Sequence, residues 1–251
     1  MVSNQISVKP SRIARVLGLV AFLLVLASTG LQLMAYLTGR PHIFGLVSLF
    51  SVDVEQNIPT FFSAFLLLFA ALLLAVITVL KRNQTASHVS HWTILSFGFL
   101  LMAADEVVSY HEQLNEPTSK LLGDASLVLF SWAIPGIVLI VVLAPFFVRF
   151  LLHLPTKTRL TFLMAAILYL GGSIGFELIG GGYAKLHGTQ NFTYSMIATV
   201  EESLEMAGVI IFIWALLKYI AENYKEVRFR FDGDHVNSGG KHGRIGDSHL
   251  G

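Results

Sequence analysis

Six apolar stretches, each long enough to cross a membrane, constrain the fold of this chain more than any other feature. They run over residues 14–37, 58–80, 92–108, 127–151, 160–179 and 197–220. A helix needs about 20 predominantly apolar residues to cross the hydrocarbon core of a bilayer. Backbone groups in lipid must be hydrogen-bonded within the chain, which a helix achieves. The sequence therefore predicts an all-α, polytopic membrane protein with a single bundle of six transmembrane helices.

Composition agrees with a membrane protein and leaves little room for a further domain. Hydrophobic residues make up 54% of the 251 residues and charged residues only 13%, with a mean hydropathy of +0.68. Soluble domains carry about a quarter charged residues. We expect one transmembrane domain over residues 1–220 and a polar, glycine-rich, disordered cytoplasmic tail over residues 221–251. The lipid bilayer is the expected partner, nucleic acid is not, and the oligomeric state stays open.

Lysine and arginine are unevenly distributed between alternate connections. All but three of the 17 lie in the N-terminal segment, the second and fourth connections with their flanks, and the C-terminal region. The three exceptions are Arg40, Lys120 and Lys185. Because cytoplasmic loops carry an excess of basic residues, the pattern predicts that both termini are cytoplasmic. No cysteine is present, which excludes disulfides and thiolate metal sites.

Small residues and prolines predict details of helix packing. Pro135, inside the predicted fourth span, predicts a kink because proline removes a helical hydrogen bond. The glycines at positions 171, 172 and 175 predict close packing of the fifth span against a neighbour.

Acidic residues show the sharpest asymmetry in the sequence. Eleven of the 16 lie in or beside the predicted extracytoplasmic half, and the other five lie in the C-terminal segment. Acidic residues contribute little to topology, so the positive-inside rule does not explain this asymmetry. Ionisable groups inside a membrane are costly unless they are paired or solvated, and such a cluster indicates a functional site.

The third predicted span and the connection after it contribute the largest group of polar residues. This group is Asp105, Glu106, Ser109, His111, Glu112 and Glu116. Spacings of four, three and four residues predict one stripe from Asp105 to Glu116 if the helix continues to Pro117. His111 would point about 100° away from Glu112 and need a different partner.

The fifth and sixth predicted spans add carboxylates on the same membrane side. Glu177 lies in the last turn of the predicted fifth span, where a negative charge opposes the helix dipole. The sixth span places three carboxylates within one third of its circumference, namely Glu201, Glu202 and Glu205. The first connection brings Asp53 and Glu55 to that side as well.

Carboxylates with an imidazole suit a divalent metal ion such as Mg, Ca, Mn or non-haem Fe. The predicted metal-binding residues are Asp105, Glu106, Ser109, His111, Glu112, Glu177, Glu201, Glu202 and Glu205. The leading hypothesis is a membrane protein with a cation- or metal-binding site at the extracytoplasmic ends of the third, fifth and sixth spans. Whether this site makes the protein a membrane-embedded metalloenzyme stays open, and no residue is assigned a catalytic role. Two alternatives stay open, which are a small proton- or cation-coupled transporter or channel and a membrane scaffold or accessory subunit.

Four short segments carry a resemblance to a known pattern. They are residues 51–59 (SVDVEQNIP), 105–112 (Asp105-Glu106 with His111-Glu112), 177–181 (ELIGG) and 201–208 (EESLEMAG). Together they resemble an uncharacterised bacterial family of six-span membrane proteins that has no established activity. The resemblance implies a location in the bacterial inner membrane and implies no catalytic role for any residue.

Overall fold

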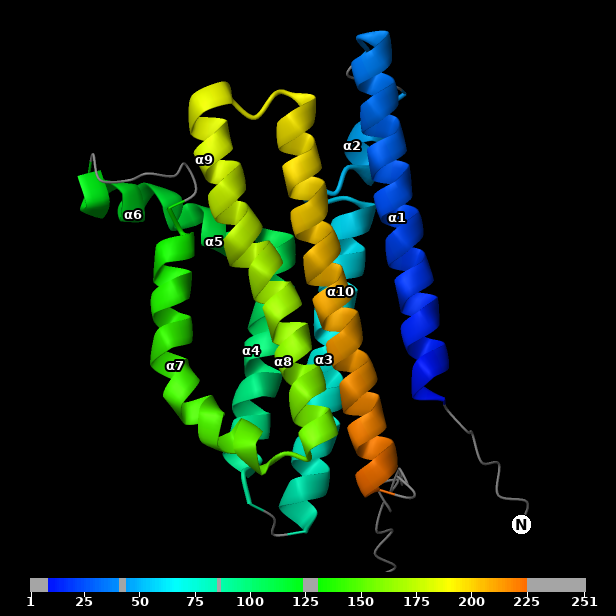
Figure 1. The fold of residues 1–251 in the computed structure, drawn as a ribbon, viewed down its shortest axis with the longest axis vertical. Coiled ribbons are helices and arrows are strands. Elements are labelled where there is room, and N and C mark those ends of the chain that lie inside the picture. Colours follow the sequence, from blue (N-terminus) through cyan, green and yellow to red (C-terminus); the bar gives the residue numbers. More distant parts are fainter. Residues whose placement is uncertain (1–8, 41–43, 85–86, 124–130, 225–251) are drawn as a thin grey trace, which may run out of the picture.

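A computed structural model describes residues 9–40, 44–84, 87–123 and 131–224, and over these residues the chain is helical with no strand. Six helices are long and apolar enough to cross a membrane, as the sequence predicts (Figure 1). They are α1 (Pro10–Thr38), α3 (Ile58–Asn83), α4 (Val89–Val108), α7 (Ala133–His153), the continuous run Thr156–His187, and α10 (Phe192–Asn223). Residues 225–251 of the predicted tail lie outside the described residues.

Polar side chains and glycine set the ends of the long helices. Asn57 and Asn191 cap α3 and α10, each accepting a hydrogen bond from a backbone N–H in the first helical turn. Gly39 ends α1 in the left-handed conformation with φ 64°, which glycine adopts without steric cost. These local signals fix where the chain leaves each span.

The helix α10 is the central element of the bundle. It packs against α1, α3 and the run formed by α8 (Thr156–Leu170), η2 (Gly171–Phe176) and α9 (Glu177–His187), while α3 also packs along α4 (Figure 1). The side chains of Leu74 and Ile77 of α3 and of Ile213 and Leu216 of α10 have no exposed surface. The apolar core therefore lies between these two helices.

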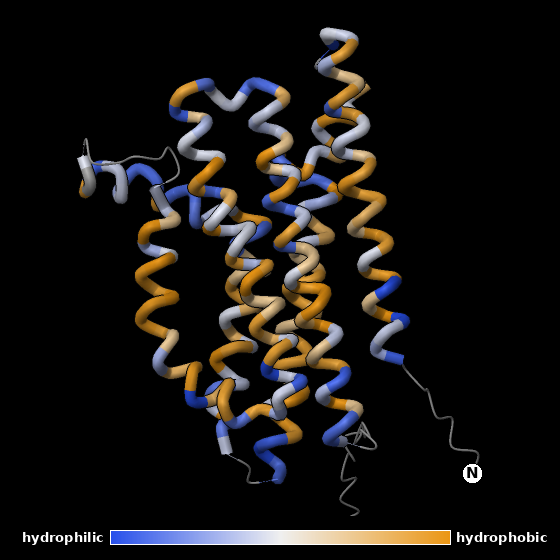
Figure 2. The backbone as a smooth tube through the Cα atoms, viewed as in Figure 1, coloured by the Kyte–Doolittle hydropathy of each residue, from blue (hydrophilic) through white to orange (hydrophobic). Residues whose placement is uncertain are grey.

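The first and last spans place both ends of the described chain on one side of the bundle. Helix α1 begins and α10 ends at the same end, which we call the terminal end, and the other is the opposite end (Figure 1). Hydrophilic residues gather at the two ends, and hydrophobic residues fill the length between them (Figure 2). This arrangement suits a lipid bilayer around the middle of the bundle. The cytoplasmic location of the termini stays a prediction from the basic residues.

The fifth span is longer than the sequence predicted. It continues through the π-helical turn η2 into α9 and ends only at His187. Glu177 therefore lies within a continuous helix and not in its last turn, so the expected conflict with the helix dipole was wrong. A π-helical turn adds a residue to the helical repeat and is frequent at functional sites.

The predicted kink at Pro135 was also wrong. Helix α7 begins at Ala133, so Pro135 lies in its first turn, where the backbone N–H needs no helical partner. Pro145 is the proline inside α7, and Figure 1 shows α7 curving in its second half.

Two glycines let α10 approach the fifth span closely. A Cβ atom added to Gly172 would lie 2.7 Å from the backbone oxygen of Glu201 and 2.9 Å from Cγ of Glu205. A Cβ atom added to Gly208 would lie 2.7 Å from the backbone nitrogen of Tyr169. Both distances are too short for carbon, so close packing depends on these glycines. For Gly172 this is the approach that the sequence predicted.

We expect Gly172→Ala to destabilise the folded protein by about 1–3 kcal/mol, because the new methyl group clashes with the α10 backbone. Gly175→Ala is the matched control, since a Cβ atom there meets nothing within 4 Å. The control should unfold at the same temperature or slightly higher, because alanine favours helix. Thermal unfolding in one detergent compares the two variants, and equal destabilisation by both would contradict this account of the packing.

Candidate functional site

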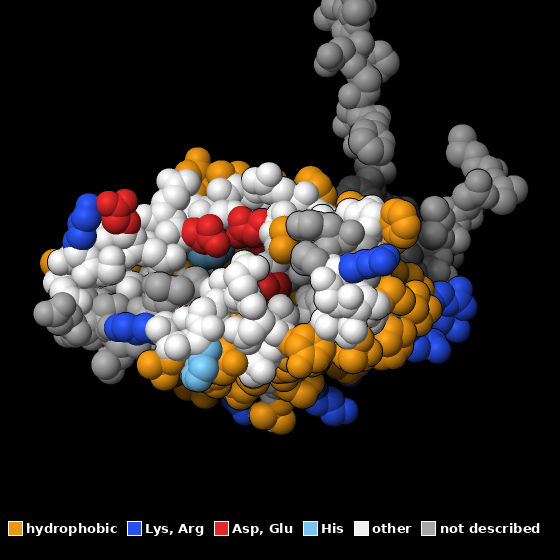
Figure 3. Space-filling view, turned by 90° about the horizontal axis from the view of Figure 1, so that it is seen from above, with side chains coloured by type: hydrophobic (Ala, Val, Ile, Leu, Met, Phe, Trp, Pro, Cys, Tyr) orange, Lys and Arg blue, Asp and Glu red, His pale blue; other side chains and the backbone are white. Residues whose placement is uncertain are grey.

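A polar cavity of about 190 Å³ lies at the opposite end of the bundle, between α4, η2, α9, α10 and the segment before α3. Nine carboxylates line it, which are Asp53, Glu55, Asp105, Glu106, Glu112, Glu177, Glu201, Glu202 and Glu205. Figure 3 looks onto this end and shows acidic side chains at the surface and another acidic side chain deeper between the helices. His111 also lines the cavity, and no lysine or arginine among the described residues does so. A cavity this acidic favours a cation.

The structure brings together eight of the nine residues that the sequence predicted for the site. Ser109 is the exception, because it does not line the polar cavity. Its side chain is 8% exposed, and its hydroxyl has no hydrogen-bond partner. The structure adds lining residues that sequence reasoning did not include in the site, namely Asp53, Glu55, Trp132, Tyr169 and Tyr194.

The predicted helical stripe from Asp105 to Glu116 was wrong. Helix α4 ends at Val108, and Ser109 takes the left-handed conformation with φ 57°. The short helices α5 (Tyr110–Gln113) and α6 (Asn115–Leu122) then follow. The chain turns sideways at Ser109, and this change of direction brings His111 against Asp105 in the last turn of α4 (Figure 1).

This turn pairs Asp105 with His111. One carboxylate oxygen of Asp105 accepts a hydrogen bond from the His111 backbone N–H at 2.9 Å, and the other lies 2.7 Å from His111 Nδ1. Asp105 is thus the partner that the sequence left open for His111. Burial lowers the pKa of the imidazole, but the hydrogen bond and charge of Asp105 outweigh burial and leave this pKa raised. A carboxylate on Nδ1 also fixes the ring orientation, as it does for histidines that bind metal.

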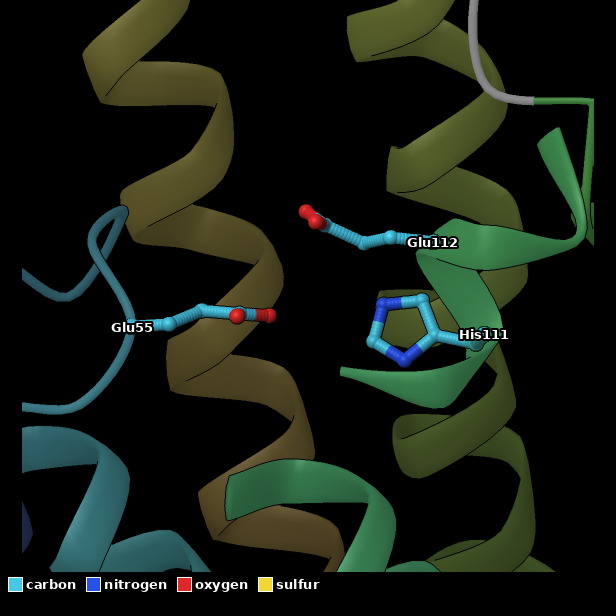
Figure 4. A group of neighbouring side chains, drawn as sticks. All are labelled: Glu55, His111 and Glu112. Atoms are coloured by element: carbon cyan, nitrogen blue, oxygen red, sulfur yellow. The ribbon is translucent and has the colours of Figure 1, made fainter. Parts of the chain in front are cut away.

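Two carboxylates lie close to His111, one beside it and one across the cavity (Figure 4). Glu55, His111 and Glu112 each offer a ligand atom, and these atoms lie within 4.8 Å of one another. Figure 4 shows Glu55 facing His111 and Glu112 from the other side of the cavity, with Nε2 of His111 directed toward the two carboxylates and Nδ1 directed away. The three residues form the group best placed to hold one metal ion.

A network of buried polar groups holds the segment that carries Asp53 and Glu55. The Asn57 side chain donates hydrogen bonds to the backbone oxygens of Ser48 and Ser51 at 2.9 and 2.5 Å. Ser28 of α1 accepts a hydrogen bond from the backbone N–H of Val52 at 3.1 Å. This segment is therefore fixed against α1, and its carboxylates face the cavity from the side opposite His111.

Electrostatic repulsion acts on the carboxylates of this segment. Burial and the nearby charge of Glu177 raise the pKa of Asp53 to about 7. Burial and the nearby charge of Glu112 raise the pKa of Glu55, and His111 offsets part of this effect. Both groups therefore hold protons more tightly than free side chains, and a bound cation would relieve the repulsion.

A second group of contacts lies across the cavity. The indole N–H of Trp132 donates a hydrogen bond of 2.6 Å to Glu177, and the Trp132 ring lies beside the His111 ring with centroids 4.7 Å apart. Glu177 and Glu201 lie within hydrogen-bonding distance of each other. Two carboxylates in contact cannot both stay ionised without a shared proton or cation. Trp132 thus contacts both Glu177 and His111.

An inner void lies beneath the polar cavity. It measures about 10 Å³ and is lined by Ser63, Glu106, Tyr169 and Glu205 among others. This is about the space of one water molecule. The hydroxyl of Ser63 is buried and has no hydrogen-bond partner among the described residues. The polar region thus extends past the polar cavity as far as the inner void, and the apolar core begins beyond this void.

We expect Asp105→Asn to lower the pKa of His111 in the metal-free protein. The substitution removes the negative charge and the charged hydrogen bond that raise this pKa, whereas the burial that lowers it remains. A raised histidine pKa stabilises the fold below the unfolded value of about 6.5, and this stability is lost as pH rises through the folded value. The stability advantage of the wild type over Asp105→Asn should therefore shrink with rising pH.

Nuclear magnetic resonance titration of the histidine rings measures this effect directly. His88 is the internal control, because it lies at the terminal end, where burial and neighbouring histidines lower its pKa. An unchanged His111 titration in Asp105→Asn would show that the pair does not control this ring.

Comparison with known proteins gives one match. No curated protein and no solved structure matches this chain. A domain of unknown function, DUF8692, matches residues 16–220, which include every residue of the polar cavity and all six spans except the first residues of α1 and the last residues of α10. The chain belongs to this family of unknown function.

Proposed function

We propose that this protein is a membrane-embedded metalloenzyme that holds a divalent metal ion between Glu55, His111 and Glu112. The observation that carries the proposal is the arrangement of these three groups, with Asp105 orienting the imidazole from behind. A bound metal ion supplies Lewis acidity or an activated water molecule. The location that fits the basic residues is a bacterial inner membrane with cytoplasmic termini and the polar cavity on the periplasmic side.

The donor set narrows the choice of metal. Carboxylate oxygens suit Mg, Ca and Mn, whereas an imidazole nitrogen suits Fe, Zn, Ni and Cu. Manganese and iron are the two of the four predicted metals that accept both kinds of ligand well. We therefore favour Mn²⁺ or Fe²⁺ over Mg²⁺ and Ca²⁺ at this site.

The remaining carboxylates suit proton handling beside the metal. Glu177 lies across the cavity, hydrogen-bonded to Trp132 and in contact with Glu201. A carboxyl pair that shares a proton can accept a proton from a substrate or return one. The cavity has space for a substrate group between this pair and His111.

Transport is the weaker alternative, because the described residues offer no polar path to the terminal end. Below the inner void the packing of α3 and α10 is apolar, with Leu66, Leu74 and Leu216 fully buried. A cation would have to cross this layer without ligands, which is costly. A scaffold role leaves the gathering of nine carboxylates in one cavity unexplained.

The first test is metal binding by the purified protein, followed by thermal unfolding across Mg²⁺, Ca²⁺, Mn²⁺ and Fe²⁺. A ligand at one hundred times its Kd stabilises the folded state by about 2.7 kcal/mol. For a chain of this size we expect Mn²⁺ or Fe²⁺ to raise Tm by roughly 5–10 °C. Mg²⁺ and Ca²⁺ should have a smaller effect.

Glu112→Gln should weaken metal affinity by at least about tenfold, because it removes one charged ligand. Glu116→Gln is the matched control, since Glu116 is exposed on α6, pairs with Lys120 and does not line the cavity. The control should bind metal as the wild type does. Equal metal affinity of the two variants, or no stabilisation by any of the four metals, would refute the metal site. Uptake of the metal ion into proteoliposomes would favour transport instead.

A further inference from the structure

An apolar pocket of about 270 Å³ lies beside the polar cavity, between α4, α7, α8 and α10. Its lining is apolar throughout except for the hydroxyl of Tyr169, and it includes Phe99, Phe162 and Phe212. The exposed residues Leu163 and Ala166 form part of its edge, so the pocket reaches the lipid-facing surface.

The apolar pocket and the polar cavity adjoin each other. Met102 and Tyr169 line both of them, and Tyr169 lines the inner void as well. Tyrosine suits such a junction, because its ring is apolar and its hydroxyl is polar. The backbone of Tyr169 is held in place by its close contact with Gly208.

Helix α7 leaves the side of the pocket open to lipid. Its first turns lie near η2, where Ile174 lies 3.3 Å from a Cβ atom built on Gly136. Its last turns pack through Phe150 onto Trp92, with ring centroids 5.0 Å apart. Between these contacts the apolar residues 137–139 and 141–143 are all exposed, by 37–67%. Most of this part of α7 is uncovered, so lipid chains can reach the pocket beside it.

We propose that the substrate of this site is a membrane amphiphile with a fatty acyl chain and an oxygen-bearing head group. The chain lies in the apolar pocket, and the head group passes Met102 and Tyr169 into the polar cavity. This inference rests on the proposed metal site only for the role of the head group, whose oxygen atoms would meet the metal. The position of the acyl chain follows only from the adjacency of the apolar pocket and the polar cavity.

A second apolar groove provides an internal comparison. It lies between α1 and α10, has a volume of about 310 Å³ and is lined by Ala207 among others. It shares no lining residue with the polar cavity. The groove shares Met206 with the inner void but, unlike the apolar pocket, no residue with the polar cavity, so it is the weaker candidate for a chain whose head group reaches the site.

Two alanine-to-tryptophan variants separate the two apolar spaces. Ala166→Trp fills the edge of the apolar pocket. Ala207→Trp fills the groove between α1 and α10. Leu163→Trp is a second variant that blocks the pocket, for use if Ala166→Trp does not fold. Thermal unfolding in nanodiscs first verifies that each variant is folded.

The probes are Mn²⁺ alone, acetohydroxamate and dodecanohydroxamate, because a hydroxamate chelates the metal and its chain length can vary. Mn²⁺ and acetohydroxamate should bind all variants equally. Ala166→Trp should weaken dodecanohydroxamate binding by about tenfold or more through steric blocking, whereas Ala207→Trp should leave it unchanged. Equal binding of dodecanohydroxamate by both variants would overturn the proposed chain site.

A photoreactive twelve-carbon fatty acid tests the chain site without metal. Labelling of the wild type and of Ala207→Trp should saturate and should be lost in Ala166→Trp. Labelling that does not saturate, or that is equal in the two variants, would overturn the inference even if Mn²⁺ binds. Saturable labelling together with absent Mn²⁺ binding would refute the metalloenzyme and support the acyl-chain site.

Discussion

The repulsion among nine carboxylates around one histidine is the constraint on which the rest of the structure depends. Charges brought together beside a membrane must be paired, protonated, solvated or bound to a cation. The structure provides part of the first three solutions, through the Asp105–His111 pair, the contact between Glu177 and Glu201, and the opening at one end. These features leave carboxylates without a partner of opposite charge, and a divalent cation would offset two further negative charges.

The scaffold keeps these groups together by close packing of backbone. Gly172 lies directly against the α10 backbone at Glu201, so the carboxylates of the sixth span come within reach of Glu177. On the other side, the buried Asn57 and Ser28 tie the segment of Glu55 to the bundle. The site is thus assembled from packing contacts and polar networks that leave little freedom for the carboxylates to separate. A site held in one geometry in this way would select among metal ions, and its carboxylates repel one another whenever no cation is bound.

Sequence patterns predicted the six spans and named eight residues that line the polar cavity, because hydrophobic runs and intramembrane charges carry strong physical penalties when misplaced. They failed where tertiary contacts decide. Serine rarely adopts a left-handed conformation, so nothing in the sequence indicated the turn at Ser109 that pairs Asp105 with His111. The position of Glu55 depends on a hydrogen bond that Asn57 donates and one that Ser28 accepts, which no local spacing reveals. Tyr169 was hidden because aromatic residues in a span usually indicate only packing.

The position of the polar cavity decides how a substrate reaches it. Apolar packing of α3 against α10 closes the site toward the terminal end, so water enters only from the opposite end. The apolar pocket adds a lateral route, and Tyr169 lies where the two routes meet. A small polar substrate would need only the aqueous opening and would leave the pocket without a purpose. An amphiphile uses both routes at once, because its chain stays in lipid while its head group meets the carboxylates and His111. The polar cavity and the adjoining apolar pocket therefore suit a reaction at the membrane surface, with an amphiphile of the bilayer as the substrate.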